Sequence, residues 1–112
     1  MEGIPYKQVK VSNQFYENFG WVCNFGFEMF GYFQAEQYKQ QIQQYINTLH
    51  DFYLIYPECR HLATKSRMYR NIILDAHLVI YRITKESIEV LDIIHSASSI
   101  RKIREVRKIS TL

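Results

Sequence analysis

The chain has 112 residues, of which 47% are hydrophobic and 15% are aromatic. This length and composition predict a single domain over residues 1–112 that buries its own core. No apolar run reaches the roughly 18 residues that a membrane-spanning helix needs, which argues against a membrane protein. Because residues 1–10 also lack the apolar segment of a secretory signal, we expect a cytoplasmic protein.

The formal net charge of +3 is divided unevenly along the chain. Residues 1–58 contain three basic and six acidic residues, a balance of −3, and residues 59–112 contain eleven basic and five acidic residues, a balance of +6. A basic half indicates a polyanionic or acidic partner. A solvated basic surface without a partner explains the same count.

The first half of the chain is expected to be mainly helical. Residues 6–12 alternate as in a short strand. Apolar residues at spacings of three and four then predict one helix over 14–30 and another over 34–53. Cys23 falls in the apolar part of the first helix and is expected to be a buried thiol. Gly31 separates the two helices, and a link this short makes them an antiparallel hairpin.

The second half is expected to form a sheet and a last helix. A polar loop over 58–68 leads into strands at 68–74, 77–83 and 87–94, joined by tight turns as an antiparallel meander. A narrow apolar stripe predicts a helix over 100–109. The fold class is therefore α+β, with an N-terminal strand, a helical hairpin packed on a mostly antiparallel sheet, and a short C-terminal helix.

The residues with functional chemistry are basic or imidazole side chains. The four histidines have no metal-ligand spacing, and no nucleophile or nucleotide-binding motif is present, so neither a metal nor another cofactor is expected. His95 ends the last predicted strand, where an imidazole can act as an acid or a base. Phosphate groups or an acidic peptide could be bound by Arg70 and by a second set of basic residues. This second set comprises Lys65, Arg67, Arg82, Arg101 and Arg104.

In its order of elements and in four segments, the chain resembles the RelE/ParE superfamily of toxins from bacterial type II toxin–antitoxin systems. The helical hairpin closes with a Leu…Tyr-Pro segment at 49–57, and the first strand of the meander carries Tyr69-Arg70. An aliphatic-Tyr strand follows at 77–83, and the next strand, at 88–95, ends in His.

The resemblance implies a small toxin that a cognate antitoxin neutralises. In this superfamily the C-terminal segment of the antitoxin wraps the helices and the sheet of the toxin, so a toxin–antitoxin hetero-oligomer is implied. The aromatic first helix fits such a partner, and Trp21, Phe25 and Phe27 become the candidate antitoxin contacts.

The target divides the superfamily into a ribonuclease branch and a gyrase-binding branch. One ribonuclease type carries an Arg three residues before the strand tyrosine, where this chain has Leu78, and another Arg after the last strand, where this chain has residues 96–98, Ser-Ala-Ser. It also carries a Tyr in its terminal helix, which this chain lacks. These departures favour a ParE-like protein that binds DNA gyrase and is not an enzyme.

Two alternatives remain open. The first is a ribosome-dependent mRNA endoribonuclease, in which Arg70 and His95 are the candidate catalytic residues and Lys65 and Arg67 add phosphate contacts. The second is a non-toxic binding domain that keeps only the fold.

Overall fold

The computed structural model describes residues 6–112, so the first five residues of the predicted domain lie outside the described part. It confirms the α+β class. The elements in chain order are β1 (Gln8–Val11), α1 (Asn13–Phe30), α2 (Tyr32–Phe52), the 3-10 helix η1 (Arg60–Leu62), β2 (Tyr69–Ile73), β3 (His77–Ile83), β4 (Ser87–His95), α3 (Ile100–Glu105) and the 3-10 helix η2 (Val106–Lys108).

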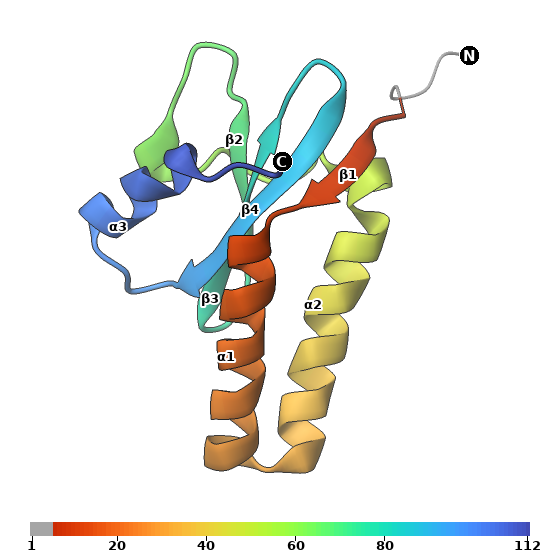
Figure 1. Ribbon diagram of the computed structural model, residues 1–112, viewed down its shortest axis with the longest axis vertical. Coiled ribbons are helices and arrows are strands. Elements are labelled where there is room, and N and C mark those ends of the chain that lie inside the picture. Colours follow the sequence, from red (N-terminus) through yellow and green to blue (C-terminus); the bar gives the residue numbers. More distant parts are fainter. Residues whose placement is uncertain (1–5) are drawn as a thin grey trace.

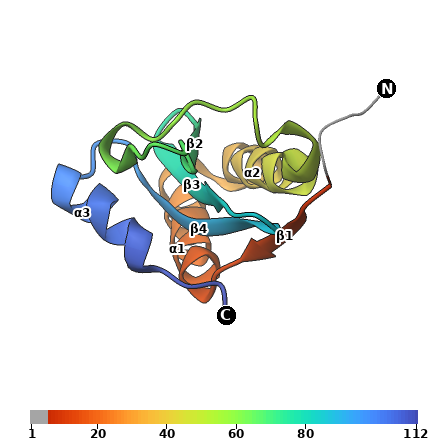
Figure 2. The ribbon, with the colours of Figure 1, turned by 90° about the horizontal axis from the view of Figure 1, so that it is seen from above.

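The four strands form one sheet in the order β1-β4-β3-β2 (Figures 1 and 2). Strands β2, β3 and β4 make the predicted antiparallel meander, and β1 pairs in parallel with β4. The β3–β4 register shifts between Ile80 and Tyr81, which lie opposite Asp92 and Val90, so Leu91 is a bulged residue. The bulge lets Ile93 face the helical hairpin while Leu91 and Ile94 face α3.

The hairpin of α1 and α2 turns at a single residue, Gly31, with φ at +82°. Its start is fixed by Ser12, whose hydroxyl accepts a hydrogen bond from the backbone N–H of Phe15 at 2.9 Å. Gly26 lets the helices approach closely, because a Cβ there would lie 3.4 Å from the Cβ of Ala35. The turn end of the hairpin projects beyond the sheet (Figure 1).

The core has two parts, one on each face of the sheet. The hairpin side buries Phe15, Ile42 and Leu49 against Val79 and Ile93, among others. The opposite face is covered by α3 and η1, and its buried residues are Cys59, Leu62, Ile80, Leu91, Ile94, Ile103 and Val106.

Three local expectations were wrong. The segment 58–68 is not only a loop, because it contains η1 and the backbone N–H of Cys59 bonds to the carbonyl of Tyr69 at 2.9 Å. The α-helix expected over 100–109 ends at Glu105 and tightens into η2. Cys23 is only half-buried, and Cys59 is the buried thiol.

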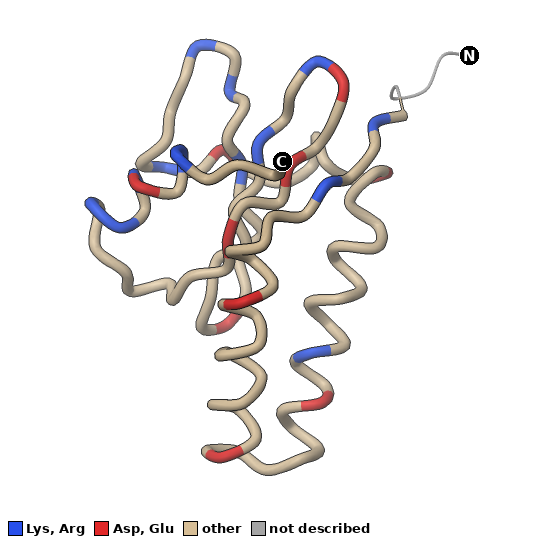
Figure 3. The backbone as a smooth tube through the Cα atoms, in the orientation of Figure 1, with Lys and Arg blue, Asp and Glu red and all other residues tan. Residues whose placement is uncertain are grey.

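The charges are separated in space as they are in sequence. Lys and Arg gather on α3, on the segment 60–70 and at the ends of the strands, whereas the hairpin carries only Lys39 (Figure 3). Within residues 6–112, no helix has the length and apolarity to cross a membrane.

Candidate functional site

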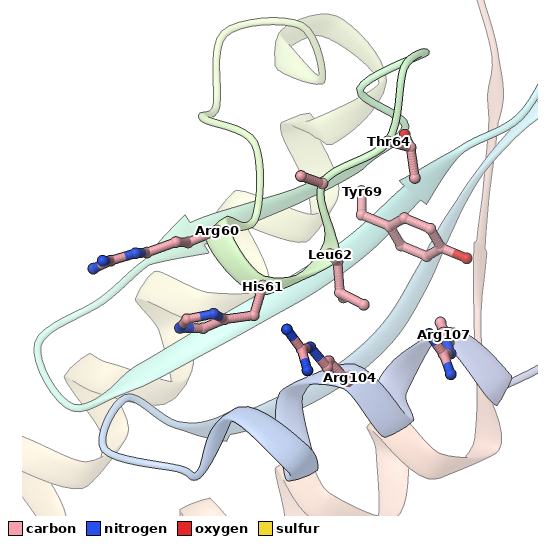
Figure 4. Close-up of a pocket in the computed structure, with 8 residues that line it drawn as sticks. Arg60, His61, Leu62, Thr64, Tyr69, Arg104 and Arg107 are labelled. Carbon is pink, nitrogen blue, oxygen red and sulfur yellow. The ribbon is translucent and has the colours of Figure 1, made fainter.

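A basic pocket lies between η1 and α3, with a volume of about 350 Å³. Its position follows from packing: Leu62 is buried with Ile103 and Val106, which holds η1 against α3. The neighbouring polar side chains are thereby placed around the opening. The lining residues are Arg60, His61, Leu62, Ala63, Thr64, Tyr69, Arg104 and Arg107 (Figure 4).

The arginines of this pocket are not neutralised by carboxylates. Within residues 6–112, the side chains of Arg60, Arg104 and Arg107 form no ion pair. Glu105 on α3 pairs instead with Lys108 at 2.9 Å. The hydrogen bond and charge of Lys108 hold the pKa of Glu105 below its ordinary value, so this carboxylate stays ionised beside the pocket. The charge of Arg107 also lowers the pKa of Glu105, so this carboxylate offsets part of the positive charge, but none of the three guanidinium groups that line the hollow is held in an ion pair. Such groups favour an anionic ligand.

A second exposed feature is an apolar stripe on α1, defined by Trp21, Phe25 and Met29. These side chains recur every four residues and therefore share one face of the helix. Their exposed fractions are 70%, 58% and 60%. Phe33, at the start of α2, is 85% exposed at the same end of the hairpin. Contiguous exposed apolar side chains of this size indicate a protein-binding surface.

A family model of known proteins matches this chain. The family model of the ParE toxin of the type II toxin–antitoxin system parDE matches residues 27–100. The chain belongs to the ParE toxin family. This confirms the superfamily inferred from the hairpin and the meander.

The same fold occurs in a solved structure of the chromosomal ParDE TA system from P. aeruginosa. The TM-score is 0.65 at 13% sequence identity, and the match covers 80% of this chain and 96% of that chain. An identity this low supports the shared fold alone. A search of the curated proteins gives no match.

In this ParE-family chain, Arg70 has a structural position. Its Nη1 donates to the carbonyl oxygens of Leu54 and Tyr56 at 3.0 and 3.1 Å, and its Nε donates to the carbonyl of Arg67 at 3.4 Å. The guanidinium of Arg70, on β2, therefore holds the segment that follows α2 against this strand.

Arg82 is also occupied by contacts within the fold. Its Nε donates to Oε1 of Glu89 at 2.7 Å, and its Nη1 donates to the hydroxyl of Tyr69 at 3.3 Å. Further bonds reach the carbonyl oxygens of Arg107 and Ile109, both at 3.2 Å. Arg82 therefore holds the C-terminal segment on the sheet, and 15% of its side chain remains exposed.

His95 lies at the far end of the sheet from Arg70. It pairs with His77 across β3 and β4, whereas Arg70 pairs with Tyr81, four positions further along β3. At about 3.4 Å per residue, this puts the two predicted catalytic residues roughly 14 Å apart along the strand. The fold therefore does not bring Arg70 and His95 together.

The His95 ring instead belongs to a cluster of three side chains. Its centroid is 5.7 Å from that of His77, and Nδ1 of His77 lies 2.8 Å from the hydroxyl of Tyr38. Nδ1 of His95 accepts from the backbone N–H of Ala97 at 3.0 Å. Among residues 6–112, no group of three or more His, Cys, Asp or Glu is placed to hold a metal ion.

The remaining predicted basic residues differ in their relation to the pocket. Arg104 lines it, whereas Arg101 and Lys65 are exposed nearby in sequence without lining it. Arg67, with φ at +55°, lies 3.8 Å from a carboxylate oxygen of Glu58.

The sequence reasoning did not single out three residues of the pocket, namely Arg60, His61 and Arg107. Arg107 had a usable signal, because it follows Arg104 by three residues and shares its helical face. No sequence signal points to Arg60 and His61, because they lie in the segment 58–68 that the sequence predicts to be a loop.

Proposed function

We propose that this ParE-family protein acts in the cytoplasm by binding DNA gyrase, without a catalytic reaction, and that a cognate antitoxin neutralises it. The observation that carries the proposal is the separation of the residues that a nuclease would use. The guanidinium of Arg70 is bonded to backbone carbonyls, Arg82 is bonded to Glu89, and His95 lies at the other end of the sheet. General acid–base catalysis needs such groups within hydrogen-bond reach of one reacting phosphate.

The apolar stripe on α1 supports a protein partner. Trp21 and Phe25 are large, exposed and separated by one helical turn, which is how a partner's apolar segment is anchored. Phe27, the third predicted antitoxin contact, is half-buried, and its ring packs 5.7 Å from that of Tyr32. We therefore assign the antitoxin contact to Trp21, Phe25 and Met29 rather than to Phe27.

The gyrase proposal is tested with purified full-length protein in a supercoiling assay. We expect loss of gyrase supercoiling as protein is added, and recovery when the cognate antitoxin is added. Unchanged supercoiling at excess protein would refute gyrase as the target. Cleavage of mRNA in a translating extract would establish the ribonuclease alternative instead.

The antitoxin contact is tested separately with Trp21→Ser and Phe25→Ser. Each change should lower the affinity for the antitoxin by about tenfold or more, since loss of a central aromatic anchor costs about 2 kcal/mol. Ile55→Ser is the matched control, because Ile55 is 68% exposed but lies after α2, away from the stripe. Equal affinities for all three variants would place the antitoxin elsewhere.

A further inference from the structure

The pocket between η1 and α3 has no role in the function proposed above, yet its side chains have the chemistry of an anion site. We propose that it binds a backbone phosphate of duplex DNA. The inference rests on the proposed function in one respect: a protein that acts on gyrase meets the duplex that gyrase holds. The binding itself can be measured without gyrase.

Three guanidinium groups lie around the pocket. Arg60 lies on η1, Arg104 on α3 and Arg107 on η2, and all three line the same hollow of about 350 Å³. Figure 4 shows Arg104 reaching from α3 towards η1, with His61 opposite it. In Figure 4 the Arg60 side chain points away from Arg104, so Arg60 lies at the rim of the hollow, while Arg104 and Arg107 line its α3 and η2 side. Guanidinium donors bind phosphate oxygens in pairs, which Arg104 and Arg107 can supply.

The side chains of the pocket arginines make no contact that stabilises the fold through a hydrogen bond or an ion pair among residues 6–112. Arg60, Arg104 and Arg107 have exposed side chains, and within residues 6–112 those side chains donate no hydrogen bond to another residue. Arg70 and Arg82, in contrast, have carbonyl or carboxylate acceptors. The like charges that line the opening repel one another, the carboxylate of Glu105 offsets part of this repulsion through its interaction with Arg107, and a bound anion would reduce it further.

The basic surface extends beyond the pocket, which favours a ligand larger than a single phosphate. Exposed cations continue beyond the pocket, at Lys65 after η1 and at Arg101 and Lys102 on α3, whereas Arg67 and Lys108 are ion-paired with Glu58 and Glu105. A ligand with charges at repeated intervals can contact the pocket and its flanks together. Nucleic acid has such charges, and it gains affinity through counterion release with each phosphate that is neutralised.

The surroundings of the pocket favour duplex DNA over single strands and over an acidic peptide. Single-stranded nucleic acid is held largely by stacking of its bases on exposed aromatic rings. Tyr69 is half-buried, with the guanidinium of Arg82 5.7 Å from its ring centroid, and Tyr81 is fully buried. An acidic peptide would gain from apolar anchors, but Leu62, the large aliphatic residue of the lining, is buried. A duplex needs only backbone contacts.

The test measures binding of the full-length protein to a short fluorescent DNA duplex by anisotropy, over a series of KCl concentrations. We expect Arg60→Gln, Arg104→Gln and Arg107→Gln each to raise the Kd severalfold. Each should also reduce the slope of log Kd against log salt by about 0.9, the value for one lost phosphate contact. Arg104→Lys, which keeps the charge, should retain most of the slope.

Lys85→Gln is the matched control, because Lys85 is exposed in the turn between β3 and β4 and lies outside the pocket. It removes the same charge and should change the Kd less than any pocket variant. Thermal unfolding of each variant verifies that the fold is retained. Equal Kd values for Lys85→Gln and the pocket variants would overturn the inference.

Two further ligands complete the experiment. Tighter binding of a single-stranded RNA of equal length, or of a polyglutamate peptide of equal charge, would also overturn the assignment to duplex DNA.

The result of the DNA-binding experiment is independent of the gyrase supercoiling assay. If the pocket variants lose DNA binding while supercoiling is unaffected by the protein, the gyrase proposal fails alone. If supercoiling is inhibited but DNA binding does not depend on the pocket, this inference fails alone.

Discussion

The guanidinium of Arg82 and the carboxylate of Glu89 meet at 2.7 Å across β3 and β4, at a point where both side chains are about five-sixths covered, with 15% and 16% exposed. The second carboxylate oxygen of Glu89 accepts from the hydroxyl of Thr111 at 2.7 Å. The pair therefore fastens the end of the chain to the sheet as well as joining two strands.

We predict that Arg82→Gln lowers the free energy of unfolding by about 2–4 kcal/mol, because it leaves Glu89 partly buried without its cation and removes two bonds to backbone carbonyls. Chemical denaturation measures the loss. Hydrogen exchange of residues 106–111 should accelerate in the same variant. A change as small as that of the exposed Lys85→Gln would show that the pair contributes little.

Gly20 and Gly31 are predicted to respond to alanine in opposite directions. Gly20 lies inside α1 with open space around a new Cβ, so Gly20→Ala should stabilise the protein by about 0.5–1 kcal/mol. Gly31 has φ +82° and ψ 173°, a conformation almost restricted to glycine, so Gly31→Ala should destabilise it by about 1–3 kcal/mol. Thermal unfolding of the two variants measures both. Stabilisation by Gly31→Ala would mean that the hairpin turn adopts another conformation.

Most elements of the fold could be predicted from the local periodicity of apolar residues in the sequence. Spacings of three and four predicted α1 and α2 within two residues of their observed bounds, and alternation predicted β3 over 77–83. The pairing of β1 with β4 was not readable, since a contact between residues 8–11 and 87–90 leaves no local pattern. The bulge at Leu91 could not be predicted from the sequence either, because bulges depend on packing against both faces of the sheet.

The arginines show why the site was harder to predict than the fold. In sequence, Arg82 and Arg104 are both basic residues in a basic half. The register decides between them. The turn consists of residues 85–86, with Thr84 bonded to Ser87, and this places Arg82 opposite Glu89, whereas the predicted turn at 84–86 would have placed it opposite Ile88. No such rule links Arg60 to Arg104, because η1 and α3 are brought together only by the buried contact of Leu62 with Ile103 and Val106.

The His77 ring should make stability depend on pH. Burial, and then the nearby His95 ring, lower the pKa of His77 below its ordinary value of 6.5. The unfolded chain therefore binds a proton at a higher pH than the folded chain does. The contribution of neutral His77 to the free energy of unfolding should be complete above about pH 6.5. It should decrease as the pH drops towards the lowered folded-state pKa.

We expect the midpoint of thermal unfolding to decrease between about pH 7.5 and 5.5, and to decrease less in His77→Gln, which cannot titrate. Glutamine can still meet the hydroxyl of Tyr38, which lies 2.8 Å from Nδ1 of His77, so the variant should fold. His50→Gln, on the exposed side of α2 beside Asp51, is the comparison variant. Identical pH profiles for wild type and His77→Gln would contradict the assignment.

Asp92 provides the last prediction, because it is an acid buried between β4 and α1 with 5% of its surface exposed. Its Oδ1 accepts from Nδ2 of Asn18 at 2.7 Å and from the backbone N–H of Ile93 at 2.8 Å. Burial raises the pKa of Asp92 despite these bonds, so the ionised form is less favourable in the folded chain than in the unfolded chain. As pH rises through the folded-state pKa, this carboxyl group lowers stability.

Asp92→Asn keeps one acceptor oxygen for both donors and removes the buried charge, so at neutral pH it should leave the free energy of unfolding unchanged or raise it. Asp92→Ala removes both bonds and leaves buried donors unpaired, which should cost about 1–3 kcal/mol. Denaturation of the two variants at neutral pH separates the charge from the hydrogen bonds. If asparagine destabilises the fold as much as alanine does, the ionised carboxylate itself stabilises this site, and the burial argument is wrong.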